Sequence, residues 1–192
     1  MRIAQLLARQ GKLEEGRRHL QETRTADNAD RIPLLLAESQ LLRDAGKIRE
    51  AFELLDTRLA AQPEQPELLY ESALLAEKLG RQDVLETNLR KLIRIKPDHA
   101  HAYNALGYSL AERNQRLAEA EQLIAKALQL SPDDPFITDS MGWVLYRKGD
   151  TAGALTYLQR AYSIRPDPEI AAHLGEVLWV VGRRDEAKMT WQ

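Results

Sequence analysis

The stretch AYNALGYSLAERNQRLAEAEQLIAKALQLSPDD, residues 102–134, decides the fold of this chain. Its second half carries apolar side chains every third or fourth residue, the spacing of one face of an α-helix: Leu117, Ala120, Leu123, Ile124, Ala127 and Leu128. The polar turn ERNQ, residues 112–115, separates this helix from the segment before it. No part of the sequence alternates with a period of two, so we expect helices and no strands.

The pattern of this stretch repeats along the whole chain. A turn residue recurs at steps of 33 to 35: Gly11, Gly46, Gly80, Asn114, Gly149 and Gly182. A mostly small residue follows each turn in phase: Gly16, Ala51, Leu85, Ala120, Ala154 and Ala187. A proline recurs at steps of 34 and 35: Pro63, Pro97, Pro132 and Pro166. Three series in phase predict a helical repeat protein.

The prolines mark helix boundaries. The four periodic prolines follow one helix, and the other four stand where the next helix begins: Pro33, Pro66, Pro135 and Pro168. Proline is tolerated in the first turn of a helix and beyond its end, but it breaks a helix interior. Each repeat therefore contains two antiparallel helices, which we name helix A and helix B, of about 14 residues each, joined by the glycine turn.

Residues 102–134 and the stretch ITDSMGWVLYRKGDTAGALTYLQRAYSIRPD, residues 137–167, resemble tetratricopeptide repeats. The resemblance includes Tyr103, Leu106 and Gly107 of helix A, a small residue of helix B and the closing proline. It implies an all-α, right-handed superhelical solenoid of antiparallel helix pairs, with about five to six repeats and eleven or twelve helices. We expect a single array over residues 1–192, with repeats near 1–30, 31–65, 66–99, 100–134, 135–167 and 168–192, the first and last incomplete. We read this array as an excerpt of a longer solenoid.

Composition excludes several classes of function. The net charge of −2 gives no bulk attraction to nucleic acid, and the absence of cysteine excludes thiol chemistry and cysteine zinc sites. No apolar run is long enough to span a membrane. His99 and His101 are two residues apart on one helix, so they point in different directions, and His19 and His173 look isolated. We find no catalytic constellation and expect no enzyme activity, no metal and no cofactor.

The candidate binding site is a stripe of helix A, because the resemblance implies that the A helices line the concave groove of the solenoid. In residues 135–148 the packing side holds Met141, Gly142 and Leu145, and the stripe lies on another side. We call the following residues and their equivalents in neighbouring repeats the helix-A stripe: Phe136, Asp139, Trp143, Tyr146 and Arg147. The partner-binding equivalents are Tyr70 and Leu74 two repeats earlier, His101, Asn104 and Tyr108 one repeat earlier, and Trp179 one repeat later.

Two interpretations of the rings in the helix-A stripe stay open. Aromatic rings beside charged groups are typical of protein-binding hot spots, yet large rings also fill gaps between successive helices. For the stripe as a whole, we favour a surface that binds a partner protein or peptide. On this interpretation the fold tolerates the loss of Trp143 better than the loss of Leu145.

A narrower resemblance covers residues 100–190. DSMGWVLYRKGD, residues 139–150, and RPDPEIAAHLGEVLWVVGRRDEA, residues 165–187, are similar to the C-terminal repeats of bacterial outer-membrane tetratricopeptide lipoproteins. In that family an adaptor binds a periplasmic C-terminal-processing protease and delivers cell-wall hydrolases to it. The resemblance implies the periplasmic side of the outer membrane, reached through a lipid anchor absent from this chain, with the cytoplasm as the alternative.

Two other hypotheses for the function remain. The array is the non-catalytic part of a larger enzyme, for instance a transferase, or it is a self-assembly module. Leu6, Leu7 and Trp191 lie at the two ends of the repeat pattern, where each end helix lacks one neighbour. We therefore expect their side chains to be partly bare and the chain to self-associate through its ends.

Overall fold

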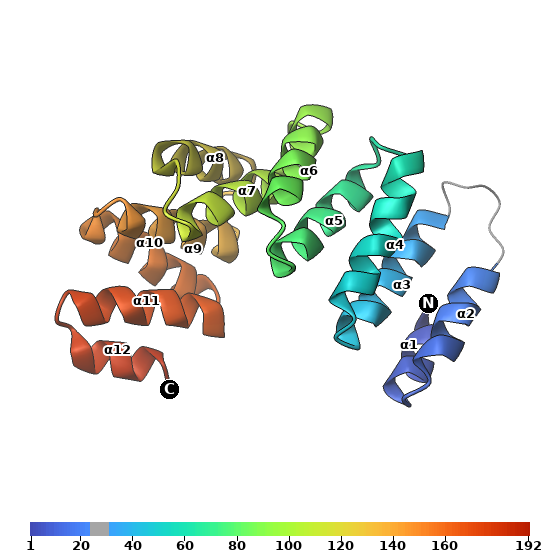
Figure 1. Ribbon diagram of the computed structural model, residues 1–192. Helices are drawn as coiled ribbons and strands as arrows, with labels where there is room; N and C mark the ends of the chain where they lie inside the picture. The colour runs from blue at the N-terminus through green and yellow to red at the C-terminus, as the bar shows by residue number, and fades with distance from the viewer. Residues whose placement is uncertain (24–30) are drawn as a thin grey trace. The chain divides into compact units, whose positions relative to one another are not determined.

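The computed structural model describes residues 1–23 and 31–192, and these residues form helices and no strands. Antiparallel helix pairs follow one another along the chain (Figure 1). They form two compact units, residues 1–96 and residues 97–192. The first unit contains α1 (Arg2–Arg9), α2 (Leu13–Glu22), α3 (Ile32–Asp44), α4 (Ile48–Ala61), α5 (Pro66–Lys78) and α6 (Gln82–Ile95). The second contains α7 (Ala100–Glu112), α8 (Leu117–Leu130), α9 (Pro135–Arg147), α10 (Thr151–Ile164), α11 (Pro168–Val180) and α12 (Arg184–Thr190).

Each expected repeat holds one helix pair, with an odd-numbered helix A followed by an even-numbered helix B. The prediction of an all-α tetratricopeptide-type solenoid with eleven or twelve helices is confirmed over the described part of the chain, which has twelve. The expected end of the first repeat at residue 30 lies outside the described residues. None of the described helices is long and apolar enough to cross a bilayer.

The turns end the A helices where the sequence predicts. Gly46, Gly80 and Gly149 have φ angles of +75°, +71° and +91°, a left-handed conformation that strains any residue with a Cβ atom. From Asn114 to Ala120 the chain has six steps, against five between the turn residue and the small residue of every other repeat, so the sequence predicts one inserted residue in this loop. In this turn Asn114 and Arg116 take positive φ angles of 54° and 45° without glycine. The insertion therefore lies in the loop before α8, as the residue count predicts.

Proline positions also agree with the prediction. The four prolines expected to open a helix occupy the first or second position of α3, α5, α9 and α11. The four periodic prolines lie between helices: Pro63, Pro97, Pro132 and Pro166. Because no described proline lies beyond the second residue of a helix, none interrupts the hydrogen bonds of a helix interior.

Close approach of helix A to helix B explains the small residues of the repeat. A Cβ atom added to Gly107 would lie 2.6 Å from Cγ1 of Ile124, and one added to Gly142 would lie 2.6 Å from Cγ of Leu158. A Cβ on Gly142 would also lie 3.1 Å from the carbonyl oxygen of Ala154, a fully buried residue of α10. The glycine on helix A thus lets a large side chain of helix B pack onto its backbone.

Candidate functional site

Three A helices of the second unit, α7, α9 and α11, carry most of the helix-A stripe. Phe136 and Trp179 are exposed, at 36% and 41%, and His101 is exposed as well. Four further members are half-buried: Asn104, Tyr108, Tyr146 and Arg147. The structure therefore brings these side chains to adjacent helices of one unit and leaves several of them accessible.

Two members of the stripe do not face outward, and the expectation for them is wrong. Trp143 is 4% exposed and Asp139 is 3% exposed. Trp143 belongs to the hydrophobic core of the second unit, together with Ile137 and Val144 of its own helix. Leu145, expected on the packing side, is only half-buried, so from burial we now expect the loss of Trp143 to be tolerated less well than the loss of Leu145. The cause is that α9 packs between two other A helices, and their side chains cover the middle of its stripe.

His173 of α11 is the residue that the sequence reasoning missed. Its Nδ1 atom lies 2.8 Å from Oδ2 of Asp139, and its Nε2 atom lies 3.4 Å from the hydroxyl oxygen of Tyr108. Its ring stacks on Trp143 with centroids 4.3 Å apart and planes inclined by 19°. His173 is thus not isolated: it joins α7, α9 and α11 through one polar and aromatic cluster.

The electrostatic surroundings favour the charged form of His173. Burial alone would lower the pKa of this imidazole. The hydrogen bond and the charge of Asp139 act the other way, as do the charges of Glu169 and Glu112, and the pKa lies above its ordinary value. The protonated ring then forms an ion pair with Asp139 and a cation–π contact with Trp143.

Two more contacts tie aromatic rings of α9 to carboxylates on the neighbouring A helices. The indole Nε1 of Trp143 donates a hydrogen bond to Oε2 of Glu112 on α7, at 2.8 Å. Tyr146 hydrogen-bonds to Glu176 of α11, and burial together with the charge of Glu176 raises the pKa of the Tyr146 phenol. The guanidinium of Arg147 lies 5.7 Å from the ring centroid of Trp143. Aromatic side chains of the stripe therefore act both as packing and as hydrogen-bond donors.

Two buried acceptors of the stripe have no hydrogen-bond partner: Oδ1 of Asn104 on α7 and Oδ1 of Asp139 on α9. The two residues are 35 positions apart, which is one repeat, so they occupy the same level of neighbouring A helices. A buried acceptor without a donor costs about 1–3 kcal/mol. Such a pair leaves an unmet demand for hydrogen-bond donors beneath the stripe.

The remaining stripe residues lie apart from this cluster. Tyr70 and Leu74 are half-buried on α5 of the first unit. At the start of α9, the guanidinium of Arg165 lies 5.2 Å from the Phe136 ring, and Nε2 of His101 lies 3.9 Å from a carboxylate oxygen of Asp134. Neither ring is in contact with the His173 cluster.

The apolar end of the second unit extends the stripe beyond α9. The rings of Trp179 and Trp191 lie with centroids 5.9 Å apart, and Trp191 is 48% exposed. The indole of Trp191 covers Gly175, where an added Cβ would lie 2.1 Å from its Nε1 atom. Trp191 therefore packs on α11 and still leaves apolar surface bare, as expected from the sequence.

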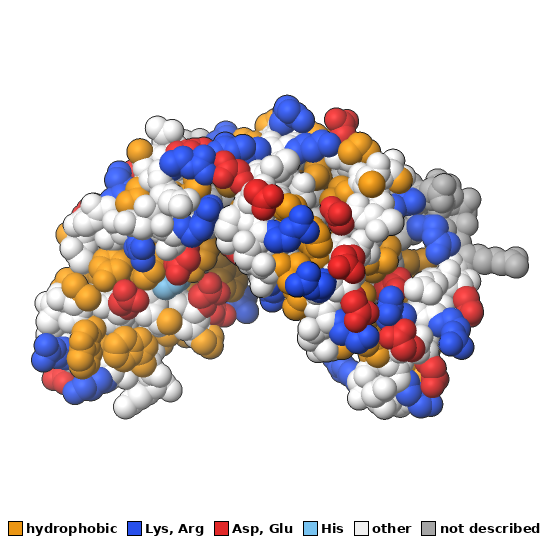
Figure 2. Space-filling view, in the orientation of Figure 1, with side chains coloured by type: hydrophobic (Ala, Val, Ile, Leu, Met, Phe, Trp, Pro, Cys, Tyr) orange, Lys and Arg blue, Asp and Glu red, His pale blue; other side chains and the backbone are white. Residues whose placement is uncertain are grey.

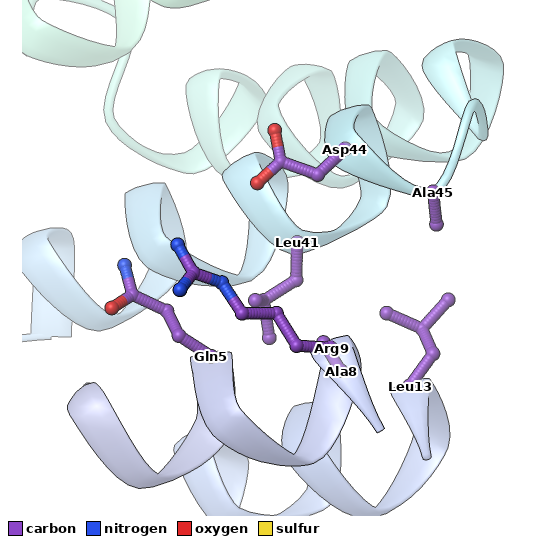
Figure 3. A pocket seen from close by; sticks show the side chains of 7 residues that line it. All are labelled: Gln5, Ala8, Arg9, Leu13, Leu41, Asp44 and Ala45. Carbon is purple, nitrogen blue, oxygen red and sulfur yellow. The ribbon is translucent and has the colours of Figure 1, made fainter. Parts of the chain in front are cut away.

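A cavity of about 210 Å³ lies in the first unit between α1, α3 and the start of α2 (Figure 3). Its apolar wall includes Leu13 and the buried Leu41, and its polar lining includes Gln5, Arg9 and Asp44. Figure 3 shows the Arg9 side chain reaching across toward α3. No residue of the helix-A stripe named above lines this cavity.

The described residues do not form a group of three or more His, Asp or Glu side chains able to hold a metal ion. His173 and Asp139 resemble an acid–base pair, but the His173 side chain is only 11% exposed and its ring is held between Trp143 and Tyr108. This geometry joins helices to one another, and it offers no accessible base to a substrate.

Comparison with known proteins places the chain in a family. Residues 36–84 and 85–135 match a tetratricopeptide repeat family, and residues 140–168 match a second one of the same description. The chain therefore belongs to the tetratricopeptide repeat proteins. Arrays of such repeats present extended surfaces that bind other proteins, and the repeat fold is typically non-catalytic.

Individual relatives agree with this assignment. TPR repeat-containing protein PA4667 of Pseudomonas aeruginosa is 42% identical over 176 residues, covering 92% of this chain and 30% of that protein. Protein O-mannosyl-transferase Tmtc1 of Drosophila melanogaster is 34% identical over 112 residues, covering 55% of this chain and 13% of that protein. The solved structure of TTC0263, a thermophilic TPR protein of Thermus thermophilus, has a TM-score of 0.73 and 25% identity, covering 81% of this chain and 86% of that one. The chain spans less than a third of the length of these two curated relatives.

Proposed function

We propose that this chain is a non-catalytic scaffold that binds a partner protein or peptide along the helix-A stripe of its second unit. The observation that carries the proposal is the set of accessible aromatic side chains on three consecutive A helices: Tyr108 on α7, Tyr146 on α9 and Trp179 on α11. Accessible Tyr and Trp next to polar groups are the side chains that contribute most at protein interfaces.

The more specific proposal is that the scaffold belongs to an adaptor of the bacterial cell envelope. In it the repeats hold a periplasmic C-terminal-processing protease and deliver cell-wall hydrolases to it, beneath an outer membrane reached through a lipid anchor. The resemblance of residues 100–190 to repeats of such adaptors supports this, as does 42% identity to a bacterial repeat protein.

A second candidate function is that of the repeat array of a larger enzyme. The 34% identity to part of a protein O-mannosyl-transferase favours it, because that transferase contains repeats similar to this chain. In this case the stripe would bind the protein that the enzyme modifies, and the chemistry would lie outside the repeats.

Site-specific photo-crosslinking in the full-length protein tests these proposals. A photoreactive phenylalanine analogue is placed at exposed A-helix positions, one variant each at His101, Glu176 and Trp179. Control variants carry it at the exposed α8 positions Gln122 and Lys126. We expect one shared partner to cross-link from the A-helix positions and not from α8, and mass spectrometry to identify it as a C-terminal-processing protease or a cell-wall hydrolase.

Other outcomes separate the alternatives. A shared partner without any link to the cell envelope supports the scaffold and contradicts the adaptor role. Cross-links from α8 with none from the A-helix positions would contradict the proposed binding surface itself.

A further inference from the structure

We propose that the segment bound by the helix-A stripe is positively charged, an extended stretch of a partner protein that carries Lys or Arg side chains. This inference rests on the proposed function, because it names the chemistry of the segment that the same surface binds. It starts from three exposed carboxylates on the A helices, which we call the carboxylate cluster: Glu112 on α7, and Glu169 and Glu176 on α11. Figure 2 shows acidic side chains among hydrophobic ones over the region of α9 and α11.

The carboxylate cluster has the buried His173 as a cationic neighbour, because the charges of Glu112 and Glu169 act on its pKa, but it has no Lys or Arg partner in the described part of the chain. No Lys or Arg of the described residues lies within salt-bridge distance of its three members. Two glutamates of the first unit do have such partners: the buried Glu38 lies 3.0 Å from Arg17, and the half-buried Glu71 lies 3.2 Å from Arg43. The stripe therefore carries an excess of negative charge, which attracts cations and repels anions.

The aromatic side chains hold two of these carboxylates in place. Glu112 accepts a hydrogen bond from the Trp143 indole, and Glu176 accepts one from the Tyr146 phenol. A carboxylate whose side chain is already ordered loses less conformational entropy when it binds a cation. The arrangement also places Glu112 and Glu176 beside an aromatic ring, and a guanidinium can stack on the face of such a ring while it pairs with the acid.

The unpartnered acceptors described above are an independent observation that points to the same chemistry. Asp139 is 3% exposed, its Oδ2 atom is held by His173, and its Oδ1 atom has no partner. Oδ1 of Asn104, at the same level of α7, has none either. Both atoms can only accept hydrogen bonds, whereas Lys and Arg side chains can only donate them. These buried acceptors add to the negative potential beneath the stripe, which favours a cationic segment at its surface.

Defined peptides test the inference with the 192-residue chain. The probe is a fluorescein-labelled twelve-residue peptide of alternating Arg and Ala, and the comparison peptides carry citrulline or Glu in place of Arg. Fluorescence anisotropy measures binding at low and at high NaCl concentration. We expect the Arg peptide to bind more tightly than the citrulline peptide, the Glu peptide to bind least, and salt to weaken the binding of the Arg peptide.

Matched variants locate the interaction. The triple variant Glu112→Gln, Glu169→Gln and Glu176→Gln removes three charges and keeps an acceptor oxygen for Trp143 and Tyr146. Because each exposed charge pair contributes modestly to binding, we expect the loss of all three charges to weaken binding of the Arg peptide about tenfold. Circular dichroism confirms that the variant is folded.

A control triple variant makes the same change in net charge elsewhere. Glu53→Gln, Asp56→Asn and Glu64→Gln alter exposed residues of the first unit, and we expect less than a twofold effect. Equal weakening in the two triple variants, or equal binding of the Arg and citrulline peptides, would overturn the inference.

The proposed function and the charge inference fail in different ways. If the citrulline or Glu peptide binds best and Tyr146→Ala abolishes that binding, the stripe binds segments and only the charge inference is wrong. If no peptide binds and the cross-links fall on α8, both proposals are wrong.

Discussion

Replacing Trp143 by alanine tests whether this ring is part of the packed interior of the second unit. The side chain is 4% exposed and stacks on His173, and its indole donates a hydrogen bond to Glu112. Deleting a buried aromatic side chain costs about 3–5 kcal/mol, and a lost hydrogen bond adds about 1 kcal/mol. We therefore expect Trp143→Ala to lower the free energy of unfolding by about 4–6 kcal/mol, a large part of the total stability of a domain.

Urea unfolding followed by circular dichroism measures this loss. The matched control is Trp179→Ala, the same substitution at a ring that is 41% exposed, for which we expect about 1–2 kcal/mol. Trp143→Phe keeps an aromatic ring and loses the indole N–H, so it should fall between the two. A loss below about 1 kcal/mol in Trp143→Ala, or one no greater than in Trp179→Ala, would refute the reasoning.

Three further predictions concern packing, pH and association. Ala154→Trp, at a fully buried contact of α9 with α10, should cost more than the roughly 1–3 kcal/mol of ordinary overpacking, and an unchanged melting temperature would contradict the repeat register. The pKa of His173 is raised in the folded protein, so its ionic contribution to stability is fully present below the unfolded pKa of about 6.5 and is lost as the pH rises through the folded value. The midpoint of urea unfolding should therefore fall more between pH 5.5 and pH 8.5 in the wild type than in His173→Gln. Equal falls in the two proteins would exclude this role. Three apolar side chains near the ends of the chain are exposed, Leu6 at 53%, Met189 at 66% and Trp191 at 48%, so the chain should self-associate as its concentration rises. The double variant Leu6→Lys, Met189→Lys should associate less. A wild-type sedimentation profile that stays monomeric at high concentration would contradict this prediction.

The fold could be predicted from the sequence because its constraints are local. Glycine at Gly46, Gly80 and Gly149 permits the left-handed turn that ends helix A. Proline is compatible only with helix boundaries, and small residues are needed where helices A and B meet. Each constraint recurs with the repeat period, so a helix boundary that is assigned wrongly in one repeat disagrees with the boundaries in the other repeats.

The burial of Trp143 could not be predicted in the same way. The spacing of residues along α9 gives the direction of a side chain relative to its own helix, but it does not give the depth of cover by neighbouring helices. Trp143 lies between α7 and α11, whereas Trp179 on α11 has a neighbouring A helix, α9, on one side within the described structure. The same stripe is therefore buried in one repeat and exposed in the next.

A signal for His173 is present in the sequence. His173 follows Asp139 by 34 residues, one more than the step of 33 between Pro135 and Pro168 at the starts of α9 and α11, so the two residues lie within one residue of the same level of neighbouring A helices. Pairing charged residues one period apart finds this contact. Aligning the stripe with a step of 33 instead places Ala172 opposite Asp139 and leaves His173 unassigned.

The central claim is that the accessible rings of the helix-A stripe bind a partner. Its most direct test is the affinity of the cross-linked partner, measured by calorimetry, for Tyr146→Ala and Trp179→Ala. Loss of an aromatic anchor costs about 2 kcal/mol or more, so we expect affinity to fall about thirtyfold in each variant while the protein stays folded. Affinities within twofold of wild type in both folded variants would contradict the claim and leave these rings a purely structural role.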